Sequence, residues 1–397
     1  MILRRAAVAL SFSTILASPA LATDEPPVVQ AIFKSWENQY KIKPTYKNLT
    51  ADGDTVTIEG LEASVAPPEG ASGGPGAKLT VGKLELKGVS DQGNGLFEVE
   101  TGTYSDFKLD VGAEGQGFTI AIPSGESDGW YVKALGDNPT PNDFFRSSLT
   151  IAHKATSGQI TLTSAGQSVT ADGYEMTWDG DAQTGAGKST FKLSNIAIPE
   201  GLIAKIDPTG TLKQIGYSSL SFDLGGQGKF DVASDKVDFD FDMFYTGKDM
   251  GTVKIGAAAG EIPVALMSEL RKEEATDFGK IMPMVQGIQV SRLLFRFEDQ
   301  SITKRLLPLA AKMQGMDEQT MIASTGAMIQ LGLTQLKNPA FTQKVVTAIN
   351  TYLKDPRSLT ISAKPAQPVT VMQVMSLDPA NPGAAIDKLG VDVTAND

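Results

Sequence analysis

Three aspartates at alternate positions, Asp238, Asp240 and Asp242, are the first candidates for chemistry in this sequence. On a β-strand their carboxylates would share one face, roughly 6.5–7 Å apart along the chain. Carboxylate oxygens suit Ca²⁺, but that ion takes six to eight oxygens, which calcium loops gather by folding tightly around a glycine. A flat strand presents too few oxygens. We therefore expect a solvated acidic face and no metal site, with a metal site at these aspartates as the alternative.

Serine-based hydrolysis is the second chemistry to consider. Gly70 to Gly74 match the pattern G-x-S-x-G around Ser72, but that motif requires a buried strand before it and a helix after it, and neither is predicted here. The one histidine of the chain, His153, lies in a strand-like run. Ser301 and Lys304 open a predicted helix, as in serine-lysine enzymes, but the partner motifs K-T-G and S-D-N are absent. We therefore predict no catalytic residues, with a hydrolase as the least favoured alternative.

Residues 182–189 match a loose phosphate-binding pattern in which Ala182 replaces the first glycine. A phosphate cradle needs a strand before the loop and a helix after it, because the amides at the start of the helix bind the phosphates. Here residues 190–198 alternate like a strand, so the segment is typical of a polar hairpin loop. One histidine and no cysteine also argue against a zinc site. We expect no cofactor.

The elements that would position these residues are mainly β-strands. Between Asp52 and Gly260, apolar and polar residues alternate, which places the apolar side chains on one face of each strand. Residues 91–95 and Asp172-Gly173 are predicted to be hairpin turns. The clearest strands are 55–59, 83–87, 96–100, 107–111, 117–122, 159–162, 191–196 and 236–242. The pattern predicts a mainly β, α+β fold with a long antiparallel meander that is curved or sandwich-like.

Helical spacing replaces this alternation toward the C-terminus. Apolar residues predict helices over 302–313, from Asp317 onward and from Asn338 to Asp355, with strands at 290–297 before them and at 358–362 after them. We expect these helices to pack on a continuation of the sheet. Residues 320–336 carry no charge, which predicts a buried helix; membrane or partner contact is the alternative.

Composition divides the chain into four parts. Residues 1–22 have a positive start, a short apolar stretch and an A-x-A site, which together predict a cleavable secretory signal. Residues 23–145 and 146–262 form two β-rich halves, joined near the Gly/Pro-containing segment 136–141, and residues 263–397 form the helical region with a few closing strands. The apolar stretch of the signal is too short to span a bilayer, so we expect no transmembrane segment after cleavage and a periplasmic location.

Charge and cysteine content restrict the partners. Loss of residues 1–22 removes two arginines and leaves 33 basic and 46 acidic side chains, a net charge of −13. Such a surface repels nucleic acid and anionic headgroups, so we predict no nucleic-acid partner. The absence of cysteine excludes disulfides and thiolate chemistry.

The apolar faces of the strands are the main indication of function. About a dozen strands with roughly three large apolar residues each need cover, at about 1.5–3 kcal/mol per side chain. The predicted helices would cover only part of such a sheet. An open apolar trough that binds a lipid or other amphiphile is one expectation, with Val237, Phe239, Phe241, Leu84 and Leu86 as candidate lining. A closed two-layer sandwich with a dry core is the other.

Three segments resemble the repeated β-rich units of AsmA-like and YdgA-like bacterial envelope proteins. These segments are residues 212–223, 250–255 and 293–307, within a region from Gly201 to Pro308. The resemblance implies an elongated periplasmic β-structure with a lipid-accommodating groove and a role in envelope integrity or lipid movement. Those families usually keep an N-terminal membrane helix, whereas a cleavable signal is predicted here.

Together these observations predict a non-catalytic periplasmic envelope protein that binds or shields a lipid or other amphiphile. The alternatives are a β-sandwich scaffold that binds an envelope protein partner, and a hydrolase.

Overall fold

The structure is a computed structural model that describes residues 25–40, 42, 44–65, 76–112, 117–136, 139–147, 149, 151–270, 278–378 and 380–397. The expected signal, residues 1–22, lies outside these ranges. The chain forms two compact units that divide between Pro199 and Glu200. The limits expected from composition, at 145 and 262, fall inside these units, the first within a short helix and the second near the end of a β-strand.

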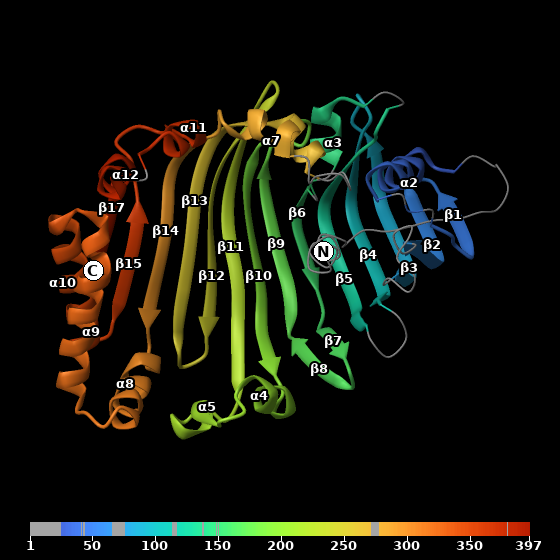
Figure 1. The fold of residues 1–397 in the computed structure, drawn as a ribbon. Coiled ribbons are helices and arrows are strands. Elements are labelled where there is room, and N and C mark those ends of the chain that lie inside the picture. The colour runs from blue at the N-terminus through green and yellow to red at the C-terminus, as the bar shows by residue number, and fades with distance from the viewer. Residues whose placement is uncertain are drawn as a thin grey trace. The chain divides into compact units, whose positions relative to one another are not determined.

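The first unit, which ends at Pro199, is an antiparallel meander (Figure 1). Each strand pairs with the next along the chain as far as β5, which pairs with both β6 and β7. β9 then pairs with β6, β8 with β7, and β10 with β8 and β9. The strands are β1 (Asn48–Asp52), β2 (Thr55–Val65), β3 (Ala77–Asp91), β4 (Leu96–Val111), β5 (Phe118–Lys133), β6 (Ile151–Ser157), β7 (Ile160–Ser164), β8 (Gln167–Ala171), β9 (Gly173–Gly180) and β10 (Gly187–Ile198).

The two turns predicted from sequence have different outcomes. The ladder between β3 and β4 ends with Asp91 opposite Phe97. The turn is therefore confirmed over residues 92–95. The hairpin predicted at Asp172-Gly173 is wrong, because β8 and β9 lie end to end and β10 pairs with both. The amide of Asp172 donates to the carbonyl oxygen of Ser194 on β10 at 2.8 Å, which keeps the backbone on the ladder through the break.

One helix contributes to the core of the first unit. In α2 (Pro27–Tyr40) the apolar residues recur at helical spacing, and Val28, Val29, Ile32 and Trp36 are all buried. They belong to one cluster with the inward-facing residues of β2 to β6. Burying each such side chain contributes about 1.5–3 kcal/mol. This part of the unit therefore has a filled core. A second, short helix, α3 (Pro141–Ser147), follows β5.

The second unit begins at Glu200 and contains a sheet in the order β11, β12, β13, β14, β15, β17, all antiparallel. β16 pairs with the start of β14. The strands are β11 (Leu220–Ala233), β12 (Lys236–Gly247), β13 (Gly251–Pro263), β14 (Gln289–Asp299), β15 (Ser358–Ala363), β16 (Val369–Thr370) and β17 (Val391–Ala395). The helices are α4 (Glu200–Ile206), α5 (Thr211–Gln214), α6 (Val264–Glu269), α7 (Phe278–Val285), α8 (Ile302–Met313), α9 (Glu318–Leu333), the 3-10 turn η1 (Thr334–Leu336), α10 (Pro339–Lys354), α11 (Val371–Met375) and α12 (Pro382–Leu389).

The predicted helices of this unit are confirmed at α8, α9 and α10. The Asp317 side chain caps α9 by accepting from the amide of Thr320, and Asn338 caps α10 by accepting from the amide of Phe341, each at 3.0 Å. Such side chains satisfy amides that have no partner inside the helix, which is why the sequence marks these starts clearly. Within the described residues, no helix is both long and apolar enough to cross a membrane.

The prediction that residues 320–336 form a buried helix is wrong in its burial. Ile322 and Gly326 are buried, and a Cβ on Gly326 would come within 2.8 Å of the Asn350 side chain of α10. Met328 and Leu331 are exposed. Helix α9 therefore buries only a narrow stripe of residues, and the uncharged side chains on its other sides are exposed to solvent. The chain as a whole is mainly antiparallel β-sheet, and most of its helices lie in the C-terminal part, as the sequence predicted.

Candidate functional site

The sheet of the second unit has one face made of apolar residues. In antiparallel strands, residues directly opposite each other point to the same side of the sheet. Their register connects the central strands: Met243 pairs with Ile255, Ile255 with Phe295, and Phe295 with Ile361. We call this surface the apolar face and define it by Phe239, Phe241, Met243, Tyr245, Val253, Ile255, Ala257, Leu293, Phe295, Phe297, Leu359 and Ile361. Every one of these residues is apolar or aromatic.

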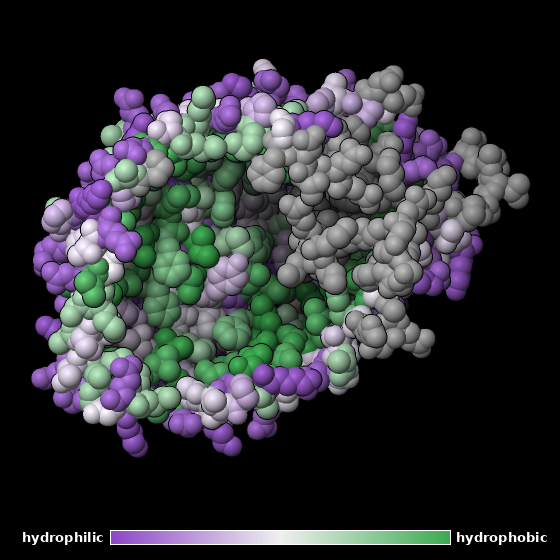
Figure 2. All heavy atoms as spheres, viewed as in Figure 1, coloured by the Kyte–Doolittle hydropathy of each residue, from purple (hydrophilic) through white to green (hydrophobic). Residues whose placement is uncertain are grey.

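The middle of the apolar face is open to solvent. Ile255, Leu293, Phe295 and Ile361, on three adjacent strands, expose between 41% and 46% of their surface. Figure 2 shows apolar side chains over these strands on a hollowed part of the surface. Single exposed hydrophobic residues are ordinary, but a contiguous apolar patch is typical of an interaction site. From strand spacing and rise, the face extends roughly 15 Å across its four strands and up to about 20 Å along them.

Helices border this face. On α10, the ring of Tyr352 lies 6.4 Å from that of Phe297 in an edge-on contact, and its hydroxyl donates to Asp299 at 3.1 Å. Burial raises the pKa of Tyr352 to about 12, so this hydroxyl stays protonated at neutral pH. Figure 1 shows α4, α5 and α8 at one end of the strands of this unit and α7 and α11 at the other. The helices line the edges and leave the centre uncovered.

The opposite face of the same sheet is polar and holds the three aspartates considered for a metal. Arg292 donates to Asp242 at 2.7 Å and also contacts Asp240. Asp238 instead accepts from the backbone amide of Glu261 at 2.8 Å. A guanidinium therefore contacts two of the three carboxylates and offsets half of their charge. Among the described residues, no group of three or more His, Cys, Asp or Glu is arranged to hold a metal ion.

The five residues predicted to line a trough divide between the two units. Phe239 and Phe241 lie on the apolar face, half-buried, with ring centroids 5.4 Å apart, and Val237 is buried at its end. Leu84 and Leu86 are buried in the core cluster of the first unit, which includes α2. These two leucines are core residues and present no open surface, because a helix that the strand pattern did not reveal shares their cluster.

None of the five residues predicted as lining lies on β13 or β14, although these strands carry the most exposed part of the face. The signal was present in the alternation Val253, Ile255, Ala257 and in Leu293, Phe295, Phe297. Period two indicates which residues share a face. It does not indicate which face remains uncovered.

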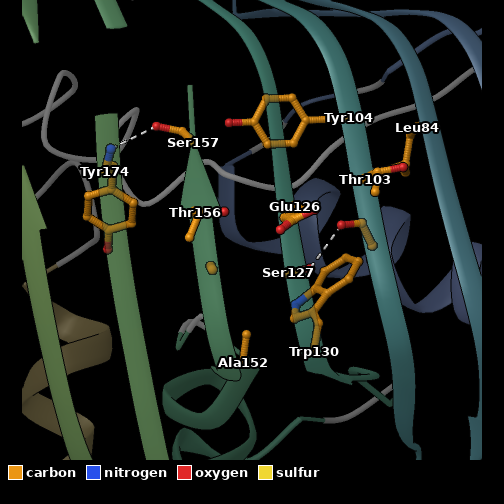
Figure 3. Close-up of a pocket in the computed structure, with 12 residues that line it drawn as sticks. Leu84, Thr103, Tyr104, Glu126, Ser127, Trp130, Ala152, Thr156, Ser157 and Tyr174 are labelled. Carbon is orange, nitrogen blue, oxygen red and sulfur yellow. Dashed lines mark hydrogen bonds between the residues drawn. The ribbon is translucent and has the colours of Figure 1, made fainter. Parts of the chain in front are cut away.

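A small pocket lies in the first unit (Figure 3). Tyr104, Ser127, Trp130 and Tyr174 contribute to its wall, and its volume is about 30 Å³. Gly102 helps to leave this space, because a Cβ there would lie 2.8 Å from Oγ of Ser127. Burial raises the pKa of Tyr104 and of Tyr174 to about 12. The pocket has room for about one water molecule and is too small for an amphiphile.

The residues considered as candidates for hydrolysis make structural contacts where the structure describes them. Ser72 lies outside the described residues. His153, in the first unit, stacks edge-on with Tyr131 at 5.6 Å and lies 6.2 Å from the ring of Trp178. Ser301, in the second unit, precedes α8 and is 2.9 Å from the hydroxyl of Tyr217. The local contacts of His153 and Ser301 are those of residues that hold elements together.

Residues 182–189 form the predicted hairpin between β9 and β10. Asp181 accepts from the amide of Gln183 at 2.8 Å and from the hydroxyl of Thr184 at 2.9 Å. Nε of the buried Arg146 donates to the carbonyl oxygen of Ala182 at 2.5 Å, and burial lowers the pKa of Arg146 to about 10. A strand follows the loop, so the geometry of a phosphate-binding loop is absent from this segment.

Comparison with known proteins adds one observation. A model of a family described as an uncharacterized protein matches residues 244–396. This match covers the part of the apolar face from the end of β12 to β15, together with β16, β17 and the C-terminal helices, and leaves out Phe239, Phe241 and Met243. No curated protein matches the chain.

Proposed function

We propose that this chain is a non-catalytic envelope protein that binds the apolar part of a lipid or another amphiphile on the apolar face of its second unit. The observation that carries the proposal is the exposure of Ile255, Leu293, Phe295 and Ile361 at the centre of the apolar face, where every residue opposite them on the adjacent strands is apolar. The expected secretory signal and the resemblance to AsmA-like and YdgA-like envelope proteins favour a periplasmic location.

Exposure of these four side chains has a cost in stability. Burial of a large apolar side chain is worth about 1.5–3 kcal/mol, so leaving two fifths of each exposed forgoes roughly 2.5–5 kcal/mol. That amount is comparable with the stability of a small domain, about 5–15 kcal/mol. A ligand that covers the face recovers part of it. An acyl chain suits a long surface of aliphatic and aromatic groups, because dispersion and burial need no directional partner.

The shape of the face distinguishes an amphiphile from a compact ligand. Compact ligands bind in concave pockets with a few placed polar groups. The apolar face extends over several strands, and the small pocket of the first unit, by contrast, has a volume of only about 30 Å³. A protein partner is the second candidate for the exposed centre, since such patches also bind proteins.

The direct test is extraction of gently purified protein with organic solvent, followed by mass spectrometry, and native mass spectrometry of the intact chain. We expect a bound lipid or other amphiphile. A clean apo mass with no extractable amphiphile, together with failure to bind an added fluorescent fatty acid, would contradict the proposal and favour the protein partner.

A pair of leucine variants assigns the binding to the face. Leu293→Ser places a hydroxyl on the apolar face at a side chain that is 46% exposed, so the fold should tolerate it. Leu331→Ser makes the same change on α9, where the side chain is 74% exposed. We expect Leu293→Ser to weaken fatty-acid binding about tenfold and Leu331→Ser to leave it unchanged, since removing a buried apolar contact costs about 1–2 kcal/mol. Equal effects of the two variants would exclude the face as the site.

A further inference from the structure

One end of the second unit has a local charge opposite to that of the whole chain. We call residues 200–214 and 302–313, which form α4, α5 and α8, the basic rim. This rim contains five basic side chains, Lys205, Lys213, Lys304, Arg305 and Lys312. Its two acidic residues are Glu200 and Asp207, whereas the complete chain has 35 basic and 46 acidic residues. The net charge of the rim is therefore positive in an acidic protein.

Specific contacts hold the rim together. Nη1 of Arg305 on α8 donates to the carbonyl oxygen of Ile215, just after α5, at 3.2 Å. The guanidinium carbon of Arg305 lies 4.5 Å from the ring centroid of Tyr217, and the Tyr217 hydroxyl is 2.9 Å from Oγ of Ser301. The carboxylate of Asp207 after α4 accepts from the amides of Thr211 and Leu212 at the start of α5. Figure 1 shows these helices at the same end of the strands of this unit.

The positive charges of the rim remain available. The Asp207 carboxylate is occupied by backbone amides at 2.9 and 2.7 Å, and these donors hold its pKa below the usual range. Lys205, Lys213, Lys304 and Lys312 are exposed. In the part of the chain that the structure describes, none of these four lysines forms an ion pair.

Apolar side chains project beside these lysines. Ile206, next to Lys205, is 63% exposed, and Met313, next to Lys312, is 79% exposed. Leu306 lies on α8 seven residues before Met313, two helical turns away and therefore on the same side of the helix, and is also exposed. Lysines that flank exposed apolar residues are the composition of helices that bind at a membrane interface, where the apolar groups enter the headgroup boundary and the lysines contact phosphates.

We propose that the basic rim docks the protein on a membrane surface that carries anionic phospholipids. Charge complementarity selects this occupant, and the acidic remainder of the chain is repelled by the same surface, so only this end faces the membrane. The inference rests on the proposed function for its purpose, because the strands of the apolar face end at this rim and an amphiphile could move between them and the bilayer. Docking itself does not require a bound amphiphile.

The test is cosedimentation of the full chain with two kinds of vesicle, phosphatidylcholine alone and phosphatidylcholine with phosphatidylglycerol in equal parts. We expect binding to the anionic vesicles that weakens as salt is raised, because exposed charges are screened. Each lysine near such a surface contributes about fivefold to affinity, so K213Q/K304Q/K312Q should weaken binding on the order of 100-fold. Met313→Ser should weaken it further without changing the salt dependence.

A charge-matched control is K83Q/K108Q/K229Q, which removes three exposed lysines of the polar sheet faces. It should bind anionic vesicles nearly as the unchanged protein does. Leu293→Ser should also bind vesicles normally while binding fatty acid about tenfold more weakly, which separates docking from the proposed function. The proposal would be overturned by an equal loss of vesicle binding in both triple-lysine variants, by equal binding to both kinds of vesicle, or by no binding to either. The last result would favour an acidic protein as the partner of the rim.

Discussion

Ion pairs at the residue scale follow from the alternation of the strands. On β3, Lys83, Glu85 and Lys87 occupy one polar face. The Glu85 carboxylate forms ion pairs with Nζ of Lys83 at 2.6 Å and with Nζ of Lys87 at 2.5 Å. The hydrogen bond from Lys83, followed by that from Lys87, lowers the pKa of Glu85 from 4.5 to about 2. Positions two apart on a strand allow this arrangement without any turn or helix.

Glu85 therefore gives a prediction about pH. Because its pKa is lower in the folded than in the unfolded chain, its contribution to stability is complete above about pH 4.5 and disappears as the pH falls toward 2. A carboxyl-carbon NMR titration should show a midpoint near 2 for Glu85, and Lys83→Gln should raise that midpoint. A midpoint at the ordinary value of a glutamate in the unchanged protein would contradict the two ion pairs.

Caps at the element scale give a prediction for α10. Asn338 accepts from the amide of Phe341, and Pro339 follows it at the first helical position, where no amide is needed. Asn338→Ala should lower the free energy of unfolding by about 1 kcal/mol, measured by urea denaturation. Asn338→Ser keeps an acceptor at the cap and should lose less. Equal losses from the two substitutions would show that the cap does not stabilise the helix.

Helix starts and strands that are set by neighbouring residues could be predicted from the sequence. Which of their side chains are buried could not. Asp317 and Asn338 mark helix starts because their side chains replace missing hydrogen-bond partners within three residues. The break at Asp172 looks like a turn locally, but pairing with β10 keeps it in the ladder. Leu84 and Phe295 have the same alternating pattern, yet Leu84 is buried and Phe295 is exposed. Their difference depends on distant elements, α2 in one unit and the helices at the edge of the sheet in the other.

At the scale of the whole molecule, the two units differ in how far they bury the apolar side chains of similar strands. The first unit gathers its inward-facing residues into one core with Val29, Ile32 and Trp36 of α2. The second places helices along the edges and ends of its sheet, and Ile255 and Phe295 remain exposed. A filled core supports stability, whereas an open apolar face forgoes part of it, and this contrast is what assigns binding to the second unit.

The distribution of tryptophan makes this assignment testable. Trp36, Trp130 and Trp178 all belong to the first unit, so tryptophan fluorescence follows the unfolding of that unit, whereas far-ultraviolet circular dichroism follows both. A ligand at one hundred times its Kd adds about 2.7 kcal/mol to the stability of the unit that binds it. With saturating fatty acid, we expect the part of the dichroism transition that fluorescence does not follow to move to higher urea, and the fluorescence transition to stay in place.

Leu293→Ser should reduce this shift by about half, because a tenfold weaker Kd leaves the fatty acid at ten times Kd, and Leu331→Ser should preserve it, because only Leu293 lies on the apolar face. A shift of the fluorescence transition alone would place the fatty acid in the first unit, against the proposed function. Equal shifts of both transitions would mean that the units unfold together. In that case the two leucine variants still decide the site, since binding on the apolar face requires that Leu293→Ser alone reduces both shifts.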